Sequence, residues 1–505
     1  MSGPKTKVAV STKGHIIDQH CKYNSGTIVE ANGFVYDCTL NQTEIGSNKN
    51  KFYIMQVIKH NKGTCCYIRF GRIGIVGRIE HKEFSTDKMA ISFFENQFKS
   101  KTGNDWFNKD NFVKKDKKYF MSEIEGADVL ESSSGENDSS GSGSENTDDS
   151  DNSDPGSKLD SRLVSFLKLI SNTNYMKNTL IELEIDTEKM PLGKISQAQI
   201  DKAYDILYKI NKNIGKNDDK KFLQLSSDFY TLIPYACGRQ QPPVIQTQKL
   251  VGKYINLLNE LTQIVSGTKA IVKLKKDKGD LNKFYNDLST EIVPLGKNND
   301  MYNILANYLK NSKAPTHNFS YEILNIFEVN RENERETYED FSKNLKNKTL
   351  LFHGTRCCNL IGIFKNGMLC DPSKLGINVC VTGKMFGMGL YFANSASKSI
   401  QYCAYDSSDN IACLFVVEAA LGKMLEKKSA DVSLTAKTLP KGYNSTWGVG
   451  KSSFKEYDEY DEIRIPKGTL KSVSNNANSS LLYDEFIIYH DEQVNLRYII
   501  QLKID

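Results

Sequence analysis

The sequence predicts a multidomain α+β protein: a mixed α/β head, an acidic linker, an all-helical middle region, and a C-terminal domain dominated by antiparallel strands. Three observations lead to this prediction. The 505 residues are 39% hydrophobic and 25% charged, and at roughly 150 residues per domain they correspond to about three globular domains. Residues 122–157 have a composition that cannot form a core. Near residue 290 the hydrophobic pattern changes from helical to strand-like.

The head, residues 1–121, combines strand and helix patterns. Residues 52–59 and 64–72 are apolar, β-prone runs separated by the turn-forming residues HNKG, so they are expected to form a hairpin. A helix is expected over residues 87–101. Its proposed apolar stripe consists of Met89, Phe93, Phe94 and Phe98.

The head is also strongly basic. Residues 1–120 contain 20 Lys and Arg residues against 11 Asp and Glu residues, a net charge of +9. Such a surface fits either a polyanionic partner or a merely solvated lysine-rich face, and charge alone leaves both interpretations open.

The linker, residues 122–157, has no Lys or Arg and consists largely of Ser, Gly, Asn, Asp and Glu. This segment cannot bury enough apolar surface to offset its ordering entropy, so it is expected to be disordered.

The middle region, residues 158–288, has the periodicity of amphipathic helices. Ser196 and Gln199 form a capping-box pattern that begins one helix, and residues 249–265 provide a second apolar helical face. Several such helices in about 130 residues predict a bundle.

The C-terminal region, residues 289–505, contains short apolar runs with Gly and Pro between them, including LLFHGT, GMGLYFAN, ACLFVVEAAL, EFIIYH and RYIIQLKI. The pattern is typical of an α+β domain built mainly on antiparallel strands.

Several classes of function are disfavoured. The 11 cysteines include no C-x-x-C pair, so zinc fingers, and metal binding generally, are not expected; reduced thiols are. STWGVGKS begins at Ser445 instead of Gly, and no G-x-G-x-x-G precedes a helix, which argues against P-loop and Rossmann sites. No apolar run is long enough to span a bilayer, and the N-terminus has no apolar signal core, so neither membrane association nor secretion by that route is expected.

The most informative motifs lie in the last third of the chain. His353-Gly354-Thr355 ends one predicted strand, and GLYFA, which contains Tyr391, begins another. Ser399 and Tyr402 follow, and Tyr483-Asp484-Glu485-Phe486 begins a third strand. In this order and at these separations, the motifs resemble the His-Tyr-Glu signature of the diphtheria-toxin-like ADP-ribosyltransferases.

The resemblance covers nearly the whole chain. Residues 289–505 resemble the catalytic domain of the poly(ADP-ribose) polymerases, through LFHGTRCCNLIGIFKNGM, VTGKMFGMGLYFANSASKSIQYC and LLYDEFIIYHDEQVNLRYIIQLK. Residues 158–288 are similar to that family's helical regulatory domain, and the head resembles its WGR domain through IRFGRIGIVG and KTGNDWFNKDNF. The domain order is similar to that of the short, zinc-finger-less, DNA-dependent members.

This resemblance implies an enzyme that cleaves the nicotinamide–ribose bond of NAD⁺ through an oxocarbenium-like transition state. The implied catalytic residues are Glu485, His353 and Tyr391. Glu485 would stabilise the developing cation, activate the acceptor hydroxyl and permit chain elongation. The remaining implied roles are NAD⁺ binding for His353, Gly354, Thr355, Tyr391, Ser399 and Tyr402, and an acceptor-side position for Met385 and Tyr483.

Some positions depart from the family's usual pattern. The family's Trp-Gly-Arg motif reads Phe70-Gly71-Arg72 in this chain. Phe70 retains an aromatic plane and Arg72 a guanidinium that suits a DNA phosphate, so both are expected to bind DNA. The other departures are Thr355, Leu369, Lys384, Met388 and Ala236.

The sequence therefore predicts a nuclear poly(ADP-ribose) polymerase that responds to DNA strand breaks in DNA damage repair. Expected partners are 5′-phosphorylated breaks or nicks, chromatin and repair proteins as acceptors, and the chain itself through automodification of the linker. NAD⁺ is the expected substrate. Two alternatives remain: a mono-ADP-ribosyltransferase, and a DNA-binding scaffold with an inactive transferase fold.

Overall fold

The computed structural model describes residues 15, 17–122, 159–183, 185, 195–216, 218–370, 385–405 and 410–505. Apart from Ser122, the predicted linker lies outside the described residues. The chain divides into two compact units. One comprises Met1–Asn146, Met176–Thr247 and Ile271–Lys278, and the other comprises Thr147–Tyr175, Gln248–Ala270 and Gly279–Asp505. The predicted helical middle region contributes to both units.

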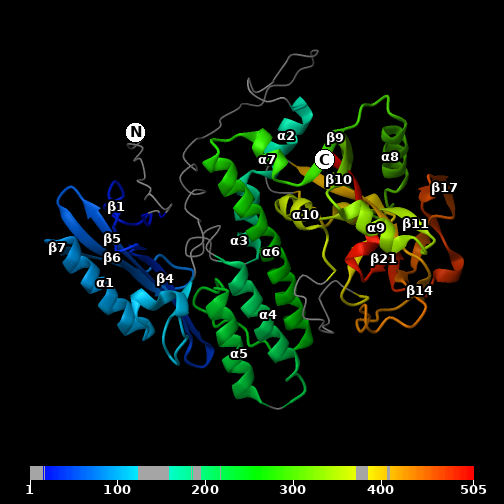
Figure 1. The fold of residues 1–505 in the computed structure, drawn as a ribbon. Coiled ribbons are helices and arrows are strands. Elements are labelled where there is room, and N and C mark those ends of the chain that lie inside the picture. The colour runs from blue at the N-terminus through cyan, green and yellow to red at the C-terminus, as the bar shows by residue number, and fades with distance from the viewer. Residues whose placement is uncertain are drawn as a thin grey trace. The chain divides into compact units, whose positions relative to one another are not determined.

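The head is an antiparallel sheet with the strand order β7-β6-β5-β4-β8, in which β1 also pairs with β5 (Figure 1). The strands are β1 (Thr27–Ile28), β4 (Asp37–Glu44), β5 (Lys49–His60), β6 (Gly63–Arg72), β7 (Arg78–Phe84) and β8 (Phe120–Ser122), with a separate hairpin of β2 (Glu30–Ala31) and β3 (Phe34–Val35). The predicted hairpin is confirmed as β5 and β6.

The predicted helix of the head is α1 (Asp87–Thr102), which packs across one face of the sheet (Figure 1). Phe94 and Phe98 are buried against the sheet, as predicted. Met89, however, is 53% exposed, so the prediction that it belongs to the apolar stripe was wrong. Met89 lies in the first turn, where the Thr86 side chain accepts a hydrogen bond from its N–H.

The helices that accompany the head in its unit are α4 (Gln197–Asn211), α5 (Asp219–Leu232) and most of α3 (Thr173–Glu182). The predicted capping box is confirmed: Gln199 N–H donates to the Ser196 hydroxyl and Ser196 N–H donates to the Gln199 side chain. Helix α5 packs against β4 through hydrogen bonds from backbone N–H groups of the head to Ser227 and Thr231.

Among its described residues, the second unit contains three sheets. The largest has the order β17-β18-β11-β13-β22-β10-β9, and smaller sheets have the orders β12-β21-β15-β14 and β19-β16-β20. The strands are β9 (Thr290–Pro294), β10 (Tyr321–Arg331), β11 (Lys348–Gly354), β12 (Leu390–Phe392), β13 (Ile411–Ala420), β14 (Met424–Lys427), β15 (Ser445–Gly448), β16 (Gly450–Ser453), β17 (Glu456–Tyr460), β18 (Ile463–Lys467), β19 (Lys471–Ser472), β20 (Leu481–Tyr483), β21 (Glu485–Ile488) and β22 (Val494–Ile504). Most pairs are antiparallel, which confirms the predicted fold class.

The helices of this unit are α2 (Ser161–Ile170), α6 (Gln248–Lys276, of which residues 248–270 belong here), α7 (Leu281–Asn286), α8 (Asp300–Asn311), α9 (Glu334–Ser342), α10 (Leu360–Asn366) and α11 (Ala396–Ile400). Helix α6 is longer than the predicted 249–265. Helix α2 is anchored on the large sheet, because Phe166 packs on Phe327 with ring centroids 4.8 Å apart.

Among the described helices, none combines the length and apolar character needed to cross a bilayer. The described cysteines are all free thiols, and all but Cys237 are buried.

Candidate functional site

A cavity of about 370 Å³ in the second unit collects the residues that the motifs single out. It lies where β11, β12 and β21 meet α11, and helix α6 borders it. The predicted residues that line it are His353, Gly354, Thr355, Tyr391, Ser399, Tyr402 and Glu485. Three motifs spread over more than 130 residues of sequence therefore converge on one site.

Strand pairing produces this convergence. Phe352 on β11 bridges to Ala393 just after β12, and β12 pairs with β21 so that Phe392 lies opposite Phe486. Gly354 then lies against α11, where a Cβ atom would be only 1.7 Å from the Ser399 carbonyl oxygen. A side chain at this position is incompatible with the packing, so the glycine of His-Gly-Thr is a structural requirement.

Hydrogen bonds fix the two rings predicted to contact NAD⁺. The His353 ring donates from Nδ1 to the Tyr391 carbonyl at 2.9 Å, which sets the tautomer with the lone pair on Nε2. The Tyr391 hydroxyl donates to the Gly387 carbonyl and accepts from Phe386 N–H, both at 2.9 Å. Both rings therefore have defined orientations before any ligand binds.

Glu485 is mostly buried, and only one of its two carboxylate oxygens has a polar partner among the described residues. Its Oε1 lies 2.8 Å from the Lys398 ammonium, and the two side chains are 12% and 15% exposed. Glu485 lines the cavity, and its Oε2 is buried and has no hydrogen-bond partner among the described residues. A buried carboxylate oxygen without a partner is costly, and a ligand hydroxyl would satisfy it.

Lys398 was not predicted as a site residue, although it lies in the motif that contains Ser399. Burial lowers its pKa, and Glu485 partly opposes that shift. Lys398 also donates to the Tyr483 carbonyl at 3.2 Å, so it ties α11 to the strand end that carries Glu485. The signal that could have found it is a lysine directly before a predicted ligand-binding serine.

Asp484 fixes the backbone next to Glu485. Its carboxylate accepts hydrogen bonds from Asn394 Nδ2 at 3.0 Å, Gly450 N–H at 2.8 Å and the Ser453 hydroxyl. Burial raises the pKa of Asp484, and these donors oppose the rise. Asp484 is not among the residues that line the cavity, so its hydrogen bonds act on Glu485 by fixing the adjacent backbone.

Ser399 and Tyr402 do not yet make the contacts that the resemblance implies. The Ser399 hydroxyl donates to the Phe352 carbonyl at 3.2 Å, and the Tyr402 ring is 60% exposed. A ligand amide that binds the Ser399 hydroxyl would have to replace its hydrogen bond to the Phe352 carbonyl. The exposed face of the Tyr402 ring is available for stacking.

Helix α6 contributes four polar side chains to the cavity wall: Asn256, Asn259, Glu260 and Gln263. Asn359 connects it to the motif residues, because its amide donates to Glu260 at 2.9 Å and to the Thr355 hydroxyl at 3.0 Å. The helical periodicity predicted the apolar face of α6, but no motif marked this polar face.

The two predicted acceptor-side residues lie outside the lining of this cavity. Tyr483 is buried, and its hydroxyl bonds to Thr316 Oγ1 at 2.8 Å. Met385 packs against the small cluster around Phe386.

Comparison with known proteins identifies the same three regions. The poly(ADP-ribose) polymerase catalytic domain matches residues 299–504, its regulatory domain matches residues 157–289, and the WGR domain matches residues 36–113. Poly(ADP-ribose) polymerase 2 of Arabidopsis thaliana is 34% identical over 486 residues, which cover 93% of this chain and 73% of that protein. The chain belongs to the poly(ADP-ribose) polymerase family.

Other relatives agree with this assignment. Poly(ADP-ribose) polymerase 2 of Zea mays is 33% identical over 99% of this chain and 76% of its own length. Poly(ADP-ribose) polymerase 1 of Xenopus laevis is 33% identical over 95% of this chain but only 46% of its own length. The chain is therefore an enzyme of this family, an ADP-ribosyltransferase that uses NAD⁺.

The head carries a separate, basic groove, of about 470 Å³. Its lining includes Lys49, Lys51, Lys101, Phe70 and Arg72. The predicted aromatic plane is present, since Phe70 stacks on Tyr53 at 5.5 Å with 25° between the rings.

Arg72 is engaged with protein groups. Its guanidinium donates to the Gly238 carbonyl at 2.5 Å and the Gln240 carbonyl at 2.6 Å, and it also bonds to Asn48. In this structure Arg72 therefore joins the head to the loop after α5, which belongs to the same unit.

The departures from the family pattern have different surroundings. Leu369 lines the catalytic cavity, and Met388 is buried beside it. Ala236 lies in the loop that Arg72 contacts, while Lys384 lies outside the described residues.

Proposed function

We propose that this family member builds poly(ADP-ribose) in response to DNA strand breaks, with Glu485, His353 and Tyr391 as its catalytic residues. The observation that supports these roles best is that Glu485 lines the cavity with a buried Oε2 that has no hydrogen-bond partner among the described residues. His353, Gly354, Thr355, Tyr391, Ser399 and Tyr402 line the same cavity and are the proposed NAD⁺ ligands. Met385 and Tyr483 are proposed for the acceptor side.

The proposed reaction begins with cleavage of the nicotinamide–ribose bond, in which the leaving nicotinamide takes the bonding electrons. The Gly354 backbone and the Ser399 hydroxyl hold its carboxamide, and the exposed face of Tyr402 stacks on its ring. His353 Nε2 accepts a ribose hydroxyl, an orientation that its Nδ1 hydrogen bond favours.

Glu485 acts on the reacting ribose and on the incoming nucleophile. Its negative charge stabilises the cation that develops at the ribose, and Oε2 accepts the proton of the attacking hydroxyl. When that hydroxyl belongs to a previously added ADP-ribose, the product is a polymer. The ion pair between Lys398 and Oε1 fixes the orientation of the Glu485 carboxylate.

The head is the proposed reader of DNA breaks. Three lysines and Phe70 around the groove supply positive charge and an aromatic plane, which suit a 5′-phosphorylated end or nick. Arg72 reaches such a phosphate by exchanging one of its contacts to Gly238 or Gln240. DNA binding would then remove a contact of the loop after α5 and so act on that loop directly.

Helix α6 is the proposed brake on NAD⁺ entry, because its polar side chains occupy one wall of the cavity. The Asn359–Glu260 hydrogen bond is one contact that would have to break as the helix loosens.

The linker is the proposed automodification target, chromatin and repair proteins are the other proposed acceptors, and the nucleus is the proposed location. The proposed domains are residues 1–121, 122–157, 158–288 and 289–505.

The test uses the purified full chain with labelled NAD⁺, with and without a nicked, 5′-phosphorylated duplex, resolved on a denaturing gel. A DNA-dependent ladder that disappears in Glu485→Gln is expected. A single sharp band would indicate mono-ADP-ribosylation, and an equal ladder without DNA would exclude the proposed DNA dependence. Absence of label from folded protein would indicate the scaffold function instead.

A further inference from the structure

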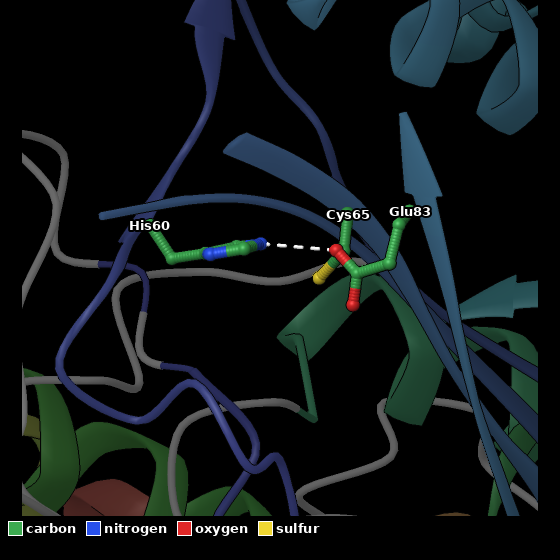
Figure 2. A group of neighbouring side chains, drawn as sticks. All are labelled: His60, Cys65 and Glu83. Carbon is green, nitrogen blue, oxygen red and sulfur yellow. Dashed lines mark hydrogen bonds and ion pairs between the residues drawn. The ribbon is translucent and has the colours of Figure 1, made fainter. Parts of the chain in front are cut away.

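A group of metal-ligating side chains lies in the head, on the sheet face opposite α1. His60 is the last residue of β5, Cys65 lies on β6 and Glu83 lies on β7 (Figure 2). One donor atom from each, the His nitrogen, the Cys sulfur and a Glu oxygen, lies within 4.8 Å of the other two. In the described part of the chain, this is the one group of three such residues that meets this distance.

Strand register explains why the three side chains converge. Cys65 is directly opposite Glu83 on β7 and opposite Ile58 on β5, and His60 lies two residues beyond Ile58. Side chains two residues apart on a strand share a face, so all three point to the same side of the sheet. Cys66, by contrast, packs into the core on the α1 side.

The three proposed ligands differ in how exposed they are to solvent. Cys65 is fully buried and the His60 side chain is 4% exposed, whereas Glu83 is 47% exposed. A metal ion here would have a protected sulfur and nitrogen on its inner side and a carboxylate at the solvent edge, where water can fill a fourth position.

The distances suit zinc. The His60 Nε2 and Glu83 Oε2 atoms are 3.1 Å apart. Zinc bonds of about 2.0–2.1 Å at a tetrahedral angle place two such ligand atoms about 3.3 Å apart, so this pair needs only a small adjustment. The Cys65 sulfur lies within 4.8 Å of one ligand atom of each of these two residues. A thiolate, a carboxylate and a neutral imidazole also balance the two charges of Zn²⁺, and this mixture of sulfur, nitrogen and oxygen is typical of zinc ligands.

The surrounding residues hold two of the ligands in place. The Tyr23 ring stacks on the His60 ring at 3.7 Å and 6°, and its hydroxyl donates to Glu83 Oε1 at 2.6 Å. Lys22 approaches the same oxygen at 3.4 Å, which leaves Oε2 as the ligand atom. Such outer contacts orient metal ligands in known sites. Lys62 N–H is 3.3 Å from His60 Nδ1, so binding through Nε2 requires that weak turn contact to open and the ring proton to move to Nδ1.

We propose that His60, Cys65 and Glu83 bind one zinc ion, with water as the fourth ligand, and that this ion clamps the ends of β5, β6 and β7. Cys65 binds as the thiolate and its proton passes to solvent. The site differs from a zinc finger in having a single cysteine and ligands from three adjacent strands, and it lies apart from the basic groove, because the two share no lining residue.

The test measures metal binding directly and needs neither NAD⁺ nor DNA. The full chain is stripped with a chelator, dialysed and titrated with Zn²⁺ in competition with a chromophoric chelator, and a parallel sample is titrated with Co²⁺ in an absorption spectrometer. The wild type is expected to bind one equivalent of each ion and to give a thiolate-to-cobalt charge-transfer band.

Four variants locate the site. Cys65→Ser is expected to abolish the charge-transfer band, and His60→Gln and Glu83→Gln to weaken Zn²⁺ binding by at least about tenfold. The matched control is Glu80→Gln, on the same strand but on the opposite face, which should bind as the wild type does. If Cys65→Ser does not fold, Glu83→Gln decides, because its half-exposed side chain can be replaced without disturbing the core. No stoichiometric binding by the wild type, or equal binding by Glu83→Gln and Glu80→Gln, would overturn the proposal.

Discussion

The cavity around Glu485 and the basic groove of the head are built by different physical means. In the cavity, His353, Tyr391 and Glu485 are held by hydrogen bonds and an ion pair, so the geometry exists before the substrate arrives. In the groove, lysines on flexible stems surround Phe70, and Arg72 is bonded to a neighbouring loop. If the proposed roles hold, the cavity selects its ligand by shape, whereas the groove selects by charge and by the exchange of contacts.

The largest effect is expected at the cavity carboxylate. Glu485→Gln removes the negative charge and the proton acceptor, so polymer formation should fall by about a hundredfold or more. Initial rates with labelled NAD⁺ measure the loss. Glu492→Gln is the matched control, because Glu492 is exposed and lies outside the cavity lining. If both variants lost activity equally, the assignment of Glu485 would be wrong.

The groove is tested by Arg72→Ala. This change removes the guanidinium that bonds to Gly238 and Gln240, so stimulation by nicked DNA should fall about tenfold while activity without DNA changes little. The control is Arg78→Ala, whose side chain is 75% exposed and pairs only with Glu80 among the described residues. Rates with saturating DNA and DNA affinities are compared, and unchanged stimulation in Arg72→Ala would remove the proposed link between groove and helices.

Stacking on Tyr402 is expected to have an effect of similar or smaller size. Tyr402→Ala should raise the KM for NAD⁺ about fivefold to tenfold, while Tyr402→Phe, which retains the ring, should stay close to the wild type. Steady-state kinetics separate KM from kcat. An equal KM in the two variants would show that the exposed ring does not contact the substrate.

A substitution in helix α6 is expected to raise activity moderately, in contrast to the losses predicted above. Gln263→Ala shortens a side chain in the cavity wall, and it should raise activity without DNA severalfold. Lys269→Ala, on an exposed position of the same helix, is the control. Lower DNA-free activity in Gln263→Ala would indicate that α6 supports the site instead of restricting it.

The smallest effect concerns pH. Burial lowers the pKa of Lys398, so this side chain loses its proton at a lower pH than an exposed lysine does. As pH rises through that pKa, Glu485 Oε1 loses its cationic partner, and kcat/KM should decline by about twofold to threefold on the alkaline side. Lys398→Arg keeps its charge and should move the decline to higher pH. An unchanged alkaline limb would assign it to another group.

Local sequence signals predicted much of this protein. The capping box at Ser196, the helix at residues 87–101 and the hairpin around residues 61–62 depend on neighbouring residues, and the structure contains all three. The motifs at His353, Tyr391 and Glu485 predicted one site because their order and separations are specific to a family, and the cavity contains them.

Other features arise only from tertiary contacts. Met89 is exposed whereas Phe94 and Phe98 are buried, and which side of α1 contacts the sheet cannot be read from periodicity alone. Lys398, Asn359 and the polar face of α6 acquire their positions because strands and helices distant in sequence pack around one cavity. The same reason applies to His60, Cys65 and Glu83: their spacing matches no metal-binding motif, and only the register of three adjacent strands brings them together. Spacing along the chain thus determined the elements and the family signature, while sheet register and packing decided which side chains meet.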